Sequence, residues 1–483
     1  MRGCARRACT ARADPPLAFT PERLRDALAG ALGAAAVEPA GYCVALSGGL
    51  DSSVLLAALA ATALPEALRA IHVDHGLHPE SALWARHSVG LAERMSVPCE
   101  VVAVQARPQP GESPEAAARS ARYAALGRRL RPGEVLLTAH HGDDQLETVL
   151  LQCLRGGGLR ALAGMPAVGA FAGGAWHARP LLGFTRAELR DWAQSQGLEW
   201  LEDPSNLDAR FDRNYLRLEV LPAVRRRWPA AAATVGRVAA QAAEAIALDE
   251  IAGAADLAAV LEGRTIALDG LAPLGPARQR RALRAWLRAL ALPVPAAATL
   301  ESLRRDMLAA AADRVPETRW PGAVVRRYRG RLHAGPTPEP SLRLGESGAA
   351  TWRPGQTLDL GALGRLELKP GRDRGLRRGG STESLVVRSR PAGALFRPSG
   401  TAHRRDLRKW LQERGVLPWM RASLPVVLAD AEIVAVGDLG YGGALAAAPG
   451  EDAWVIEWHG RPVLTEDEAI TARLPVAGEG RFR

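Results

Sequence analysis

Short apolar runs alternate with longer amphipathic stretches between residues 40 and 200. The runs have the length and composition of buried strands, and they cover 42–46, 70–74, 99–104 and 134–139. The stretches between them carry apolar residues at helical spacing, over 52–63, 81–95 and 113–130. This alternation predicts an α/β fold, in which a Rossmann-like parallel sheet has helices on both faces.

The pattern changes beyond "LPAVRRRWP" (221–229). Alanine and arginine then recur at helical spacing, and a short hairpin is expected over 320–335. After the Pro- and Gly-rich segment 335–340, short strands and turns surround one expected helix, 404–415. The predicted organisation begins with a disordered basic extension (1–20) and an α/β domain (21–229). A mainly helical domain (230–335), a small α+β domain (341–460) and a tail (461–483) follow.

The stretch "CVALSGGLDSSVLLAAL" (43–59) joins the first strand to its helix. Gly48 and Gly49 permit positive φ and let an anion approach without a Cβ in the way. A helix beginning near Asp51 adds partial positive charge. Hydroxyl donors surround the glycines, on Ser47, Ser52 and Ser53. An ordinary Gly-rich turn is the alternative, but the complete SGGxDS pattern favours phosphate binding, and the lack of GK[ST] excludes the lysine-bearing P-loop.

A second polar cluster follows the fourth strand, within "TAHHGDDQLETVLLQCLRGGG" (138–158). If a helix begins near Gly142, Asp143 and Asp144 share one of its faces with Glu147. Acids in a first turn also suit the helix dipole, but this alternative does not explain the adjacent histidines. Because ligands gather beyond the carboxyl ends of parallel strands, the cluster is expected to bind Mg²⁺ with ATP or to hold a substrate ammonium group.

The chain carries more positive than negative charge, with 62 Lys and Arg against 52 Asp and Glu and a formal net charge of +10. Lysine occurs only at Lys369 and Lys409. A GC-rich genome explains the preference for arginine but not the excess of positive charge. That excess favours a polyanionic partner such as RNA.

Length and composition indicate an ordinary globular chain. Its 483 residues suggest about two to four domains, and no apolar run of about 18 residues predicts a membrane span. The five cysteines form no CxxC pair, which argues against a disulfide framework or a zinc site and fits a reduced cytoplasm. The basic N-terminus lacks the apolar core of a secretory signal.

Specific motifs resemble known families. "SGGLDS" resembles the pyrophosphate loop (PP-loop) of the N-type ATP pyrophosphatases, which split ATP into AMP and pyrophosphate. The acidic segment, 138–165, is similar to the "AHHxDDQxET" segment of the tRNA(Ile)-lysidine synthetases. Further segments resemble the same family, over 72–81, 115–126, 179–182, 202–222 and 396–427. The chain departs from the family at Ala161, where glycine is common, and at Phe211, where tyrosine is usual.

The resemblance implies a ligase that joins free L-lysine to C2 of the wobble cytidine of tRNA(Ile) with a CAU anticodon. ATP first adenylates the cytidine, and lysine then displaces AMP. The product, lysidine, changes codon recognition from AUG to AUA. ATP, Mg²⁺, this tRNA and lysine are the implied cofactors and partners, with a cytoplasmic location and no membrane. The oligomeric state is left open, a homodimer being one alternative.

The resemblance also implies roles for individual residues. The ATP loop would comprise Ser47, Gly48, Gly49, Leu50, Asp51 and Ser52, with further ATP contacts from His72, Val73 and Arg213. The catalytic carboxylates would be Asp51, Asp143, Asp144 and Glu147, of which Asp51 and Asp144 would also bind the metal. Substrate contacts would come from Arg119, Arg122, His140, Asp143 and Glu147. Which carboxylate is the general base stays open, and solvated arginines are the alternative for Arg119 and Arg122.

Other polar residues have ordinary explanations. Local turn structure is as good an explanation for "DPSNLD" (203–208) as substrate contact. His75 and His78 lack a matching metal-ligand set. The arginine-rich segment with Trp286, the 320–335 hairpin and the 404–415 helix are candidates for gripping tRNA, through phosphate contacts rather than base reading.

Three rival functions remain at this stage. A PP-loop thiolase would need paired cysteines. An amidotransferase-type synthetase would need a cysteine after the initiator methionine, where Arg2 stands. A non-catalytic RNA-binding protein with a relic loop would have no reason to keep the serines, Asp51 and the acidic trio.

Overall fold

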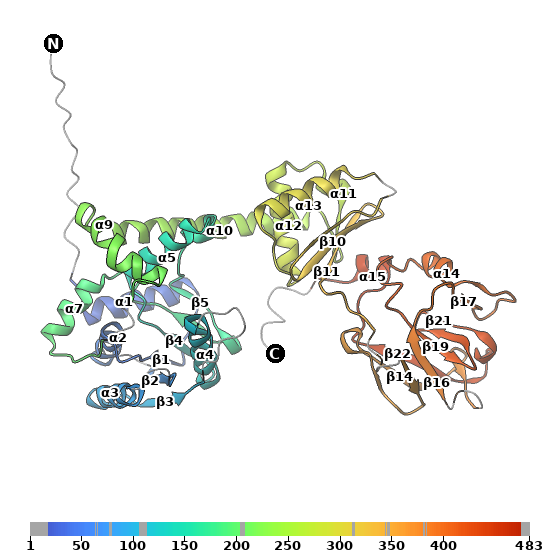
Figure 1. The fold of residues 1–483 in the computed structure, drawn as a ribbon, viewed down its shortest axis with the longest axis horizontal. Helices are drawn as coiled ribbons and strands as arrows, with labels where there is room; N and C mark the ends of the chain where they lie inside the picture. Colours follow the sequence, from blue (N-terminus) through green and yellow to red (C-terminus); the bar gives the residue numbers. More distant parts are fainter. Residues whose placement is uncertain are drawn as a thin grey trace, which may run out of the picture. The chain divides into compact units, whose positions relative to one another are not determined.

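The computed structural model describes residues 18–474, apart from 63, 65, 77–79, 106–113, 203–207, 312–313, 343, 345–347, 380–381 and 383. The described residues divide into two compact units, with the boundary between Leu248 and Asp249. Each unit is described by itself (Figure 1). Most of the predicted 1–20 extension lies outside the described residues, and Phe19 is buried against the rings of Phe184 and Trp192.

A six-stranded sheet forms the centre of the first unit, in the order β3-β2-β1-β4-β6-β5. Its first four strands pair in parallel, which confirms the predicted parallel sheet. They are β1 (Gly41–Ala45), β2 (Ala67–Asp74), β3 (Cys99–Ala103) and β4 (Glu134–Leu137). Two short strands that periodicity did not indicate extend one edge, β6 (Trp176–Ala178) parallel to β4 and β5 (Val168–Ala170) antiparallel to β6.

Successive side chains of β1 face opposite layers of helices. Tyr42 and Val44 belong to a core with Leu28, from α1 (Pro21–Ala34), and with side chains of α2 (Leu50–Ala60), α3 (Ser81–Arg94) and α7 (Arg186–Ser195). Cys43 lies in the core of the other face with Leu126, from α4 (Pro114–Arg129). A strand covered on both faces needs apolar residues at every position, which explains the unbroken runs in the sequence.

The strand order creates a switch point between β1 and β4. The chain runs from β1 outward through β2 to β3, and returns to the opposite side of β1 as β4. Ligands of open α/β sheets bind at such a point, where the two outgoing loops separate. The loop after β4 leads into α5, and the remaining elements of the unit follow: α5 (Gly142–Leu154), α6 (Leu159–Leu162), α8 (Asp212–Tyr215), a π-helical turn (Leu216–Val220), α9 (Leu221–Arg227) and the first part of α10 (Ala231–Ala258), whose residues after Leu248 belong to the second unit.

The second unit begins with an antiparallel sheet in the order β7-β8-β11-β10-β9. The predicted hairpin is β10–β11, but the prediction of a mainly helical domain omitted the rest of this sheet because β7 and β8 are too short to show a period. Trp286 and Leu300 pack in its core. The elements are β7 (Leu261–Glu262), β8 (Thr265–Ala267), α11 (Leu268–Leu271), α12 (Pro276–Ala289), α13 (Ala297–Ala309), β9 (Glu317–Trp320), β10 (Ala323–Tyr328) and β11 (Arg331–Pro336).

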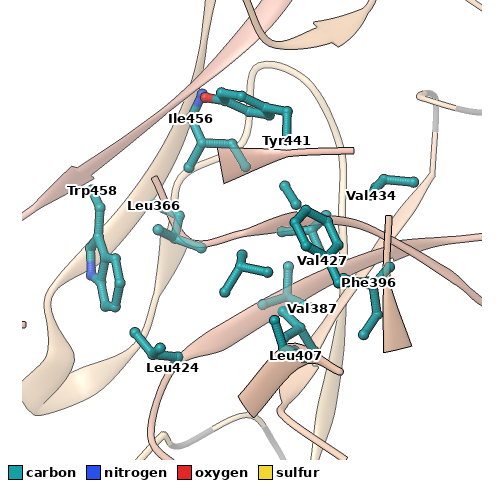
Figure 2. Close-up of a cluster of buried hydrophobic side chains, with 14 of the residues drawn as sticks. Leu366, Val387, Phe396, Leu407, Leu424, Val427, Val434, Tyr441, Ile456 and Trp458 are labelled. Atoms are coloured by element: carbon teal, nitrogen blue, oxygen red, sulfur yellow. The ribbon is translucent and has the colours of Figure 1, made fainter. Parts of the chain in front are cut away.

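Two antiparallel sheets, β12-β16-β19-β20-β21 and β13-β14-β22-β15, follow. Side chains from both, including Val427 and Leu366, meet in one buried cluster with Leu407 of α14 (Figure 2), which confirms the predicted small α+β domain. The elements are β12 (Ala349–Trp352), β13 (Leu358–Asp359), β14 (Arg365–Arg372), β15 (Leu376–Arg377), β16 (Leu385–Ser389), β17 (Leu395–Phe396), β18 (Arg405–Asp406), α14 (Leu407–Glu413), β19 (Pro425–Ala429), β20 (Glu432–Val436), β21 (Gly440–Tyr441) and β22 (Asp452–His459).

A short helix, α15 (Glu466–Thr471), lies in the segment predicted as a featureless tail. Its Ala469 carbonyl accepts a hydrogen bond from the Arg264 N–H at 2.8 Å, and the Glu466 carboxylate pairs with Arg329 at 2.9 Å. Helix α15 is therefore bound to the sheet β7-β8-β11-β10-β9. No helix among the described residues is long and apolar enough to cross a membrane.

Candidate active site

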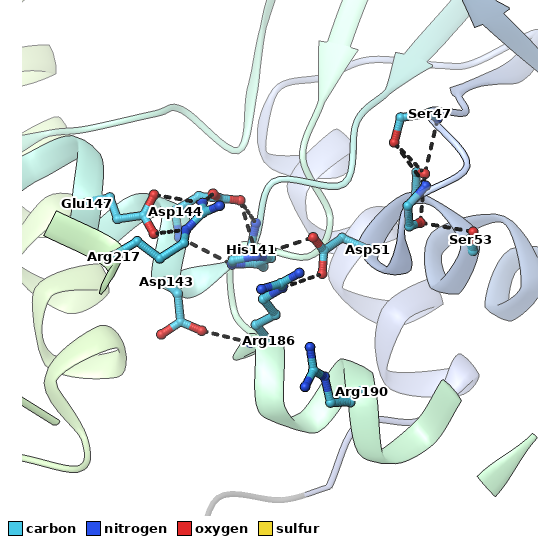
Figure 3. A network of polar contacts seen from close by, with 12 residues as sticks. Ser47, Asp51, Ser53, His141, Asp143, Asp144, Glu147, Arg186, Arg190 and Arg217 are labelled. Carbon is cyan, nitrogen blue, oxygen red and sulfur yellow. Dashed lines mark hydrogen bonds and ion pairs between the residues drawn. The ribbon is translucent and has the colours of Figure 1, made fainter. Parts of the chain in front are cut away.

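The loop between β1 and α2 is organised by its own serines (Figure 3). The Ser47 and Ser52 hydroxyl oxygens lie 2.9 Å apart. Ser52 and Ser53 also donate to the Gly49 carbonyl, at 3.1 and 2.9 Å. These hydroxyls hold the loop in shape, so an anion in the loop would be met first by main-chain N–H groups.

The backbone of this loop fits a phosphate group. Gly48 has a φ of 81°, and a Cβ there would lie 2.8 Å from Ser88 Oγ, so glycine is required. No side chain caps the N-terminus of α2 at Gly49, which leaves the first N–H groups of the helix, from Leu50 onward, for an external anion.

His72 fixes the start of the same loop from the neighbouring strand. Its Nδ1 lies 2.9 Å from the Leu46 carbonyl, to which it donates. Burial lowers the pKa of His72, so the ring is neutral and supports the loop without adding charge. Val73 follows it in β2 and is half-buried.

The predicted acidic helix begins at Gly142, as α5, and His141 caps it. The His141 Nδ1 accepts from the Asp144 N–H at 3.2 Å, and the Asp144 carboxylate accepts from the His141 N–H at 3.1 Å. Asp143 and Glu147 are buried, so the acids of this helix lie inside the unit rather than on a solvated face.

Two arginines that lie one turn apart neutralise Glu147. Arg217 donates to both of its carboxylate oxygens, at 2.8 and 3.0 Å. Arg213 donates to Glu147 at 2.9 Å, and each arginine also lies 3.2 Å from Asp144. Burial lowers the pKa of Arg217, but its bonds to Glu147 outweigh this and raise it.

Asp143 makes separate contacts. Its carboxylate accepts from the Arg225 guanidinium at 2.7 Å and from the Arg186 N–H at 2.8 Å. The Arg186 guanidinium in turn lies 3.7 Å from Asp51. Asp143 therefore faces α7 and α9, whereas Asp144 faces the two arginines described above.

His141 joins the two loops of the switch point. Its Nε2 lies 3.6 Å from Asp51 and 3.4 Å from Asp144 (Figure 3). Burial lowers the pKa of His141, but the carboxylates of Asp51 and Asp144 outweigh burial, so the pKa lies above its ordinary value. For Asp144 the two effects have the opposite signs. Burial raises its pKa, but the positive charges of His141 and Arg213 outweigh burial and bring the pKa below the ordinary value. The PP-loop and the acidic helix thus form one connected site.

The predicted metal ligands differ in their availability. One buried oxygen of Asp51, Oδ1, accepts no hydrogen bond, and its charged neighbour is Arg186 Nε at 3.7 Å. A cation could bind this oxygen if it replaced that guanidinium. The oxygens of Asp144 already face His141 and the two arginines. Among the described residues, the group of three side chains that could hold a metal is elsewhere, at Glu367, Glu457 and His459. The site fits a cation at Asp51, and less well at Asp144.

A second hydrogen-bonded chain sets the tautomer of His140. Arg179 donates to Nδ1 of His177 at 3.1 Å, so the His177 proton is on Nε2, 2.8 Å from the Thr138 hydroxyl. Thr138 then donates to Nδ1 of His140 at 2.8 Å. The proton of His140 is therefore on Nε2. Burial lowers the pKa of His140 to about 3 and that of His177 to about 3, so both rings are neutral at pH 7.

Arg119 and Arg122 both precede Tyr123 on α4, with their guanidinium carbons 4.9 and 5.6 Å from the ring centre. Arg119 is close enough to depress the pKa of His140. The structure thus brings Arg119 and His140 into one region.

Sequence reasoning missed four residues of this site: His141 as the bridge, Arg186, Arg217 and Arg225. Arg217 had a usable signal, because it follows Arg213 by one helical turn. Trp286 was a wrong candidate for RNA contact, since it is fully buried and donates to the Arg264 carbonyl. Asp203, Ser205 and Asn206, like His78, lie outside the described residues.

Three family models match the chain. The PP-loop domain matches residues 25–224, the TilS substrate binding domain 267–333 and the TilS substrate C-terminal domain 385–458. The curated tRNA(Ile)-lysidine synthase of Methylococcus capsulatus is 42% identical over 427 residues, which cover 86% of this chain and 96% of that protein. The chain belongs to the tRNA(Ile)-lysidine synthase family.

Further curated members of the family agree. The tRNA(Ile)-lysidine synthase of Alkalilimnicola ehrlichii is 42% identical over 90% of this chain and 97% of its own length. That of Coxiella burnetii is 36% identical over 88% of this chain and 92% of its own length. The chain is thus an ATP-dependent ligase of this family.

Proposed function

We propose that the chain joins L-lysine to the wobble cytidine of tRNA(Ile) with a CAU anticodon, in two steps. The cytidine O2 attacks the α-phosphorus of ATP, and pyrophosphate leaves. The lysine ε-amine then attacks C2, AMP leaves with the former O2, and the amine proton passes to a carboxylate. The proposal places this reaction in the cytoplasm.

The carrying observation is the uncapped N-terminus of α2 beside the buried acid and arginine cluster. Main-chain N–H groups from Leu50 onward would bind the β- and γ-phosphates, and His72 and Val73 would lie near adenine. The loop contains no lysine that could stabilise negative charge on the γ-phosphate. This supports cleavage at the α-phosphorus.

Magnesium would bind at Asp51, where Oδ1 accepts no hydrogen bond and would exchange its ion pair with Arg186 for the metal. A cation there would neutralise charge on the leaving pyrophosphate. Asp144 would contribute only if both arginines, Arg213 and Arg217, released its Oδ1. The role we propose for Arg213 is to turn from Asp144 toward the ATP phosphates.

Lysine would be bound by the acidic helix. Asp143 and Glu147 are the carboxylates for its ammonium group, and Arg119, Arg122 and His140 are candidates for its carboxylate or for phosphate. Because both oxygens of Glu147 accept from arginines, contact with lysine requires one guanidinium to move. Asp143, with fewer arginine contacts, is the better candidate for the first contact.

The arginines of the 320–335 hairpin contribute less to tRNA binding than their number suggests. Arg326 pairs with Glu317 and Glu339, and Arg327 donates to the Met307 and Ala310 carbonyls. The exposed arginines of α12 are paired as well, Arg278 with Asp256 and Arg288 with Glu250. Phosphate contacts would fall instead to Arg408 and Lys409, which are exposed on α14.

The test is incubation of the purified protein with ATP, labelled lysine and the tRNA. Lysine-dependent label in the tRNA with equal AMP release is expected, and tRNA in which the wobble cytidine is replaced by uridine is the matched control. Release of ADP, or RNA binding without AMP, would contradict the proposal.

A further inference from the structure

The exposed aromatic side chains of the described residues all lie on one segment. Phe211, Tyr215 and Trp228 are 42%, 52% and 60% exposed, and every other described Phe, Tyr and Trp is buried or half-buried. The segment that carries them, 211–228, comprises α8, the π-helical turn and α9.

The opposite side of this segment builds the active site. Arg213 and Arg217 point inward to Glu147, at 2.9 and 2.8 Å. Phe211 and Tyr215 lie on either side of Arg213 and one turn apart, and the Tyr215 N–H donates to the Phe211 carbonyl at 2.8 Å. The two rings are therefore carried by the same short helical segment as the arginines that pair with Glu147.

Arginines gather beside Trp228, whereas the segment around Phe211 carries both signs, with Arg210 paired to Asp208 and Arg155 paired to Asp212. Arg225, Arg226 and Arg227 form the last turn of α9, and the Arg227 guanidinium carbon lies 5.9 Å from the centre of the Trp228 ring. A ligand with flat apolar faces and negative charges matches this combination, and unpaired nucleotides have both.

We propose that Phe211 and Tyr215, with Trp228 beyond them, form a stacking platform for the unpaired anticodon-loop bases next to the modified cytidine. The inference rests on the proposed function, since it concerns the same RNA. Loop bases can be splayed out and stacked on aromatic rings. Holding the neighbours on the outer side of 211–228 would leave the cytidine free to enter on the inner side. Stacking uses the ring and not a hydroxyl, so phenylalanine and tyrosine are equivalent for it.

The test compares Phe211→Ala, Tyr215→Ala and Trp228→Ala with Phe211→Tyr and Tyr215→Phe, which keep the rings. Leu248→Ala is the control for losing an exposed apolar side chain, since Leu248 is 62% exposed. The ligand is an RNA hairpin of the anticodon stem and loop, with 2-aminopurine beside the wobble position. Its fluorescence reports stacking directly.

Each alanine variant at Phe211 and Tyr215 should weaken hairpin binding by roughly 5- to 150-fold and abolish the quenching of 2-aminopurine on binding. The ring-keeping variants and Leu248→Ala should bind the hairpin like the wild type. The KM for ATP should not change in the alanine variants or in the controls. Unaltered binding and quenching in the alanine variants, or equal losses in Leu248→Ala, would overturn the platform. A wild-type protein that binds the hairpin but forms no lysidine would instead refute the proposed function, so the two failures are distinguishable.

Discussion

The shared neutralisation of Glu147 predicts that Arg213 and Arg217 are strongly non-additive in stability. The Glu147 side chain is 1% exposed, and those of Arg213 and Arg217 are 32% and 24% exposed. Either arginine alone still leaves Glu147 a charged partner. Loss of both leaves a buried carboxylate without a counter-ion.

The expected magnitudes follow from the bonds lost. Arg217→Gln removes the two-pronged contact and should cost about 2 kcal/mol, and Arg213→Gln about 1 kcal/mol. The double variant should cost about 5 kcal/mol, because an uncompensated buried charge costs about 3–5 kcal/mol. For a unit of this size, that is a fall of roughly 10–20 °C in transition temperature.

Differential scanning calorimetry of the full chain measures these shifts. Arg210→Gln is the control, since Arg210 is 87% exposed in its pair with Asp208, and it should leave the transition unchanged. Adding Glu147→Gln to the double variant should restore much of the stability, because the unpaired charge is removed. Additive costs to within about 0.5 kcal/mol, or a triple variant no more stable than the double, would refute the shared pairing.

Three further outcomes are expected. Gly263→Ala should lower the transition temperature of the second unit far more than Gly330→Ala. Both glycines have positive φ, but only a Cβ at Gly263 would clash with the Ile470 carbonyl oxygen. Equal effects in calorimetry would refute docking of α15 there. Asp51→Asn should abolish AMP release while leaving the affinity for tRNA within about twofold, as measured by filter binding; retained AMP release would exclude Asp51. Stability should be full above about pH 6.5 and should fall as pH drops toward 3, because the unfolded chain binds a proton that His177, with its pKa lowered to about 3, does not accept in the fold. His177→Phe should reduce that pH dependence in urea titrations, and an unchanged slope would contradict it.

Periodicity and two motifs determined the first domain before any coordinates. A strand buried on both faces is apolar throughout, and the helices that cover it repeat their apolar residues every three or four positions, so β1 to β4 and α2 to α5 could be located along the chain. The PP-loop and the acidic helix were readable for the same reason, since each is a continuous stretch whose residues act together. The resemblance to the lysidine synthases rested on these local strings.

Only the tertiary structure decided the partners of the charged groups. Glu147 pairs with arginines 66 and 70 positions later, and His141 reaches Asp51 across the switch point of the sheet. Composition could not distinguish these arginines from others in an arginine-rich chain, because a helical period states which face a residue occupies but not what that face meets. Whether an aromatic ring such as Tyr215 is packed or exposed depends on the same long-range contacts, which arise only when distant segments fold together.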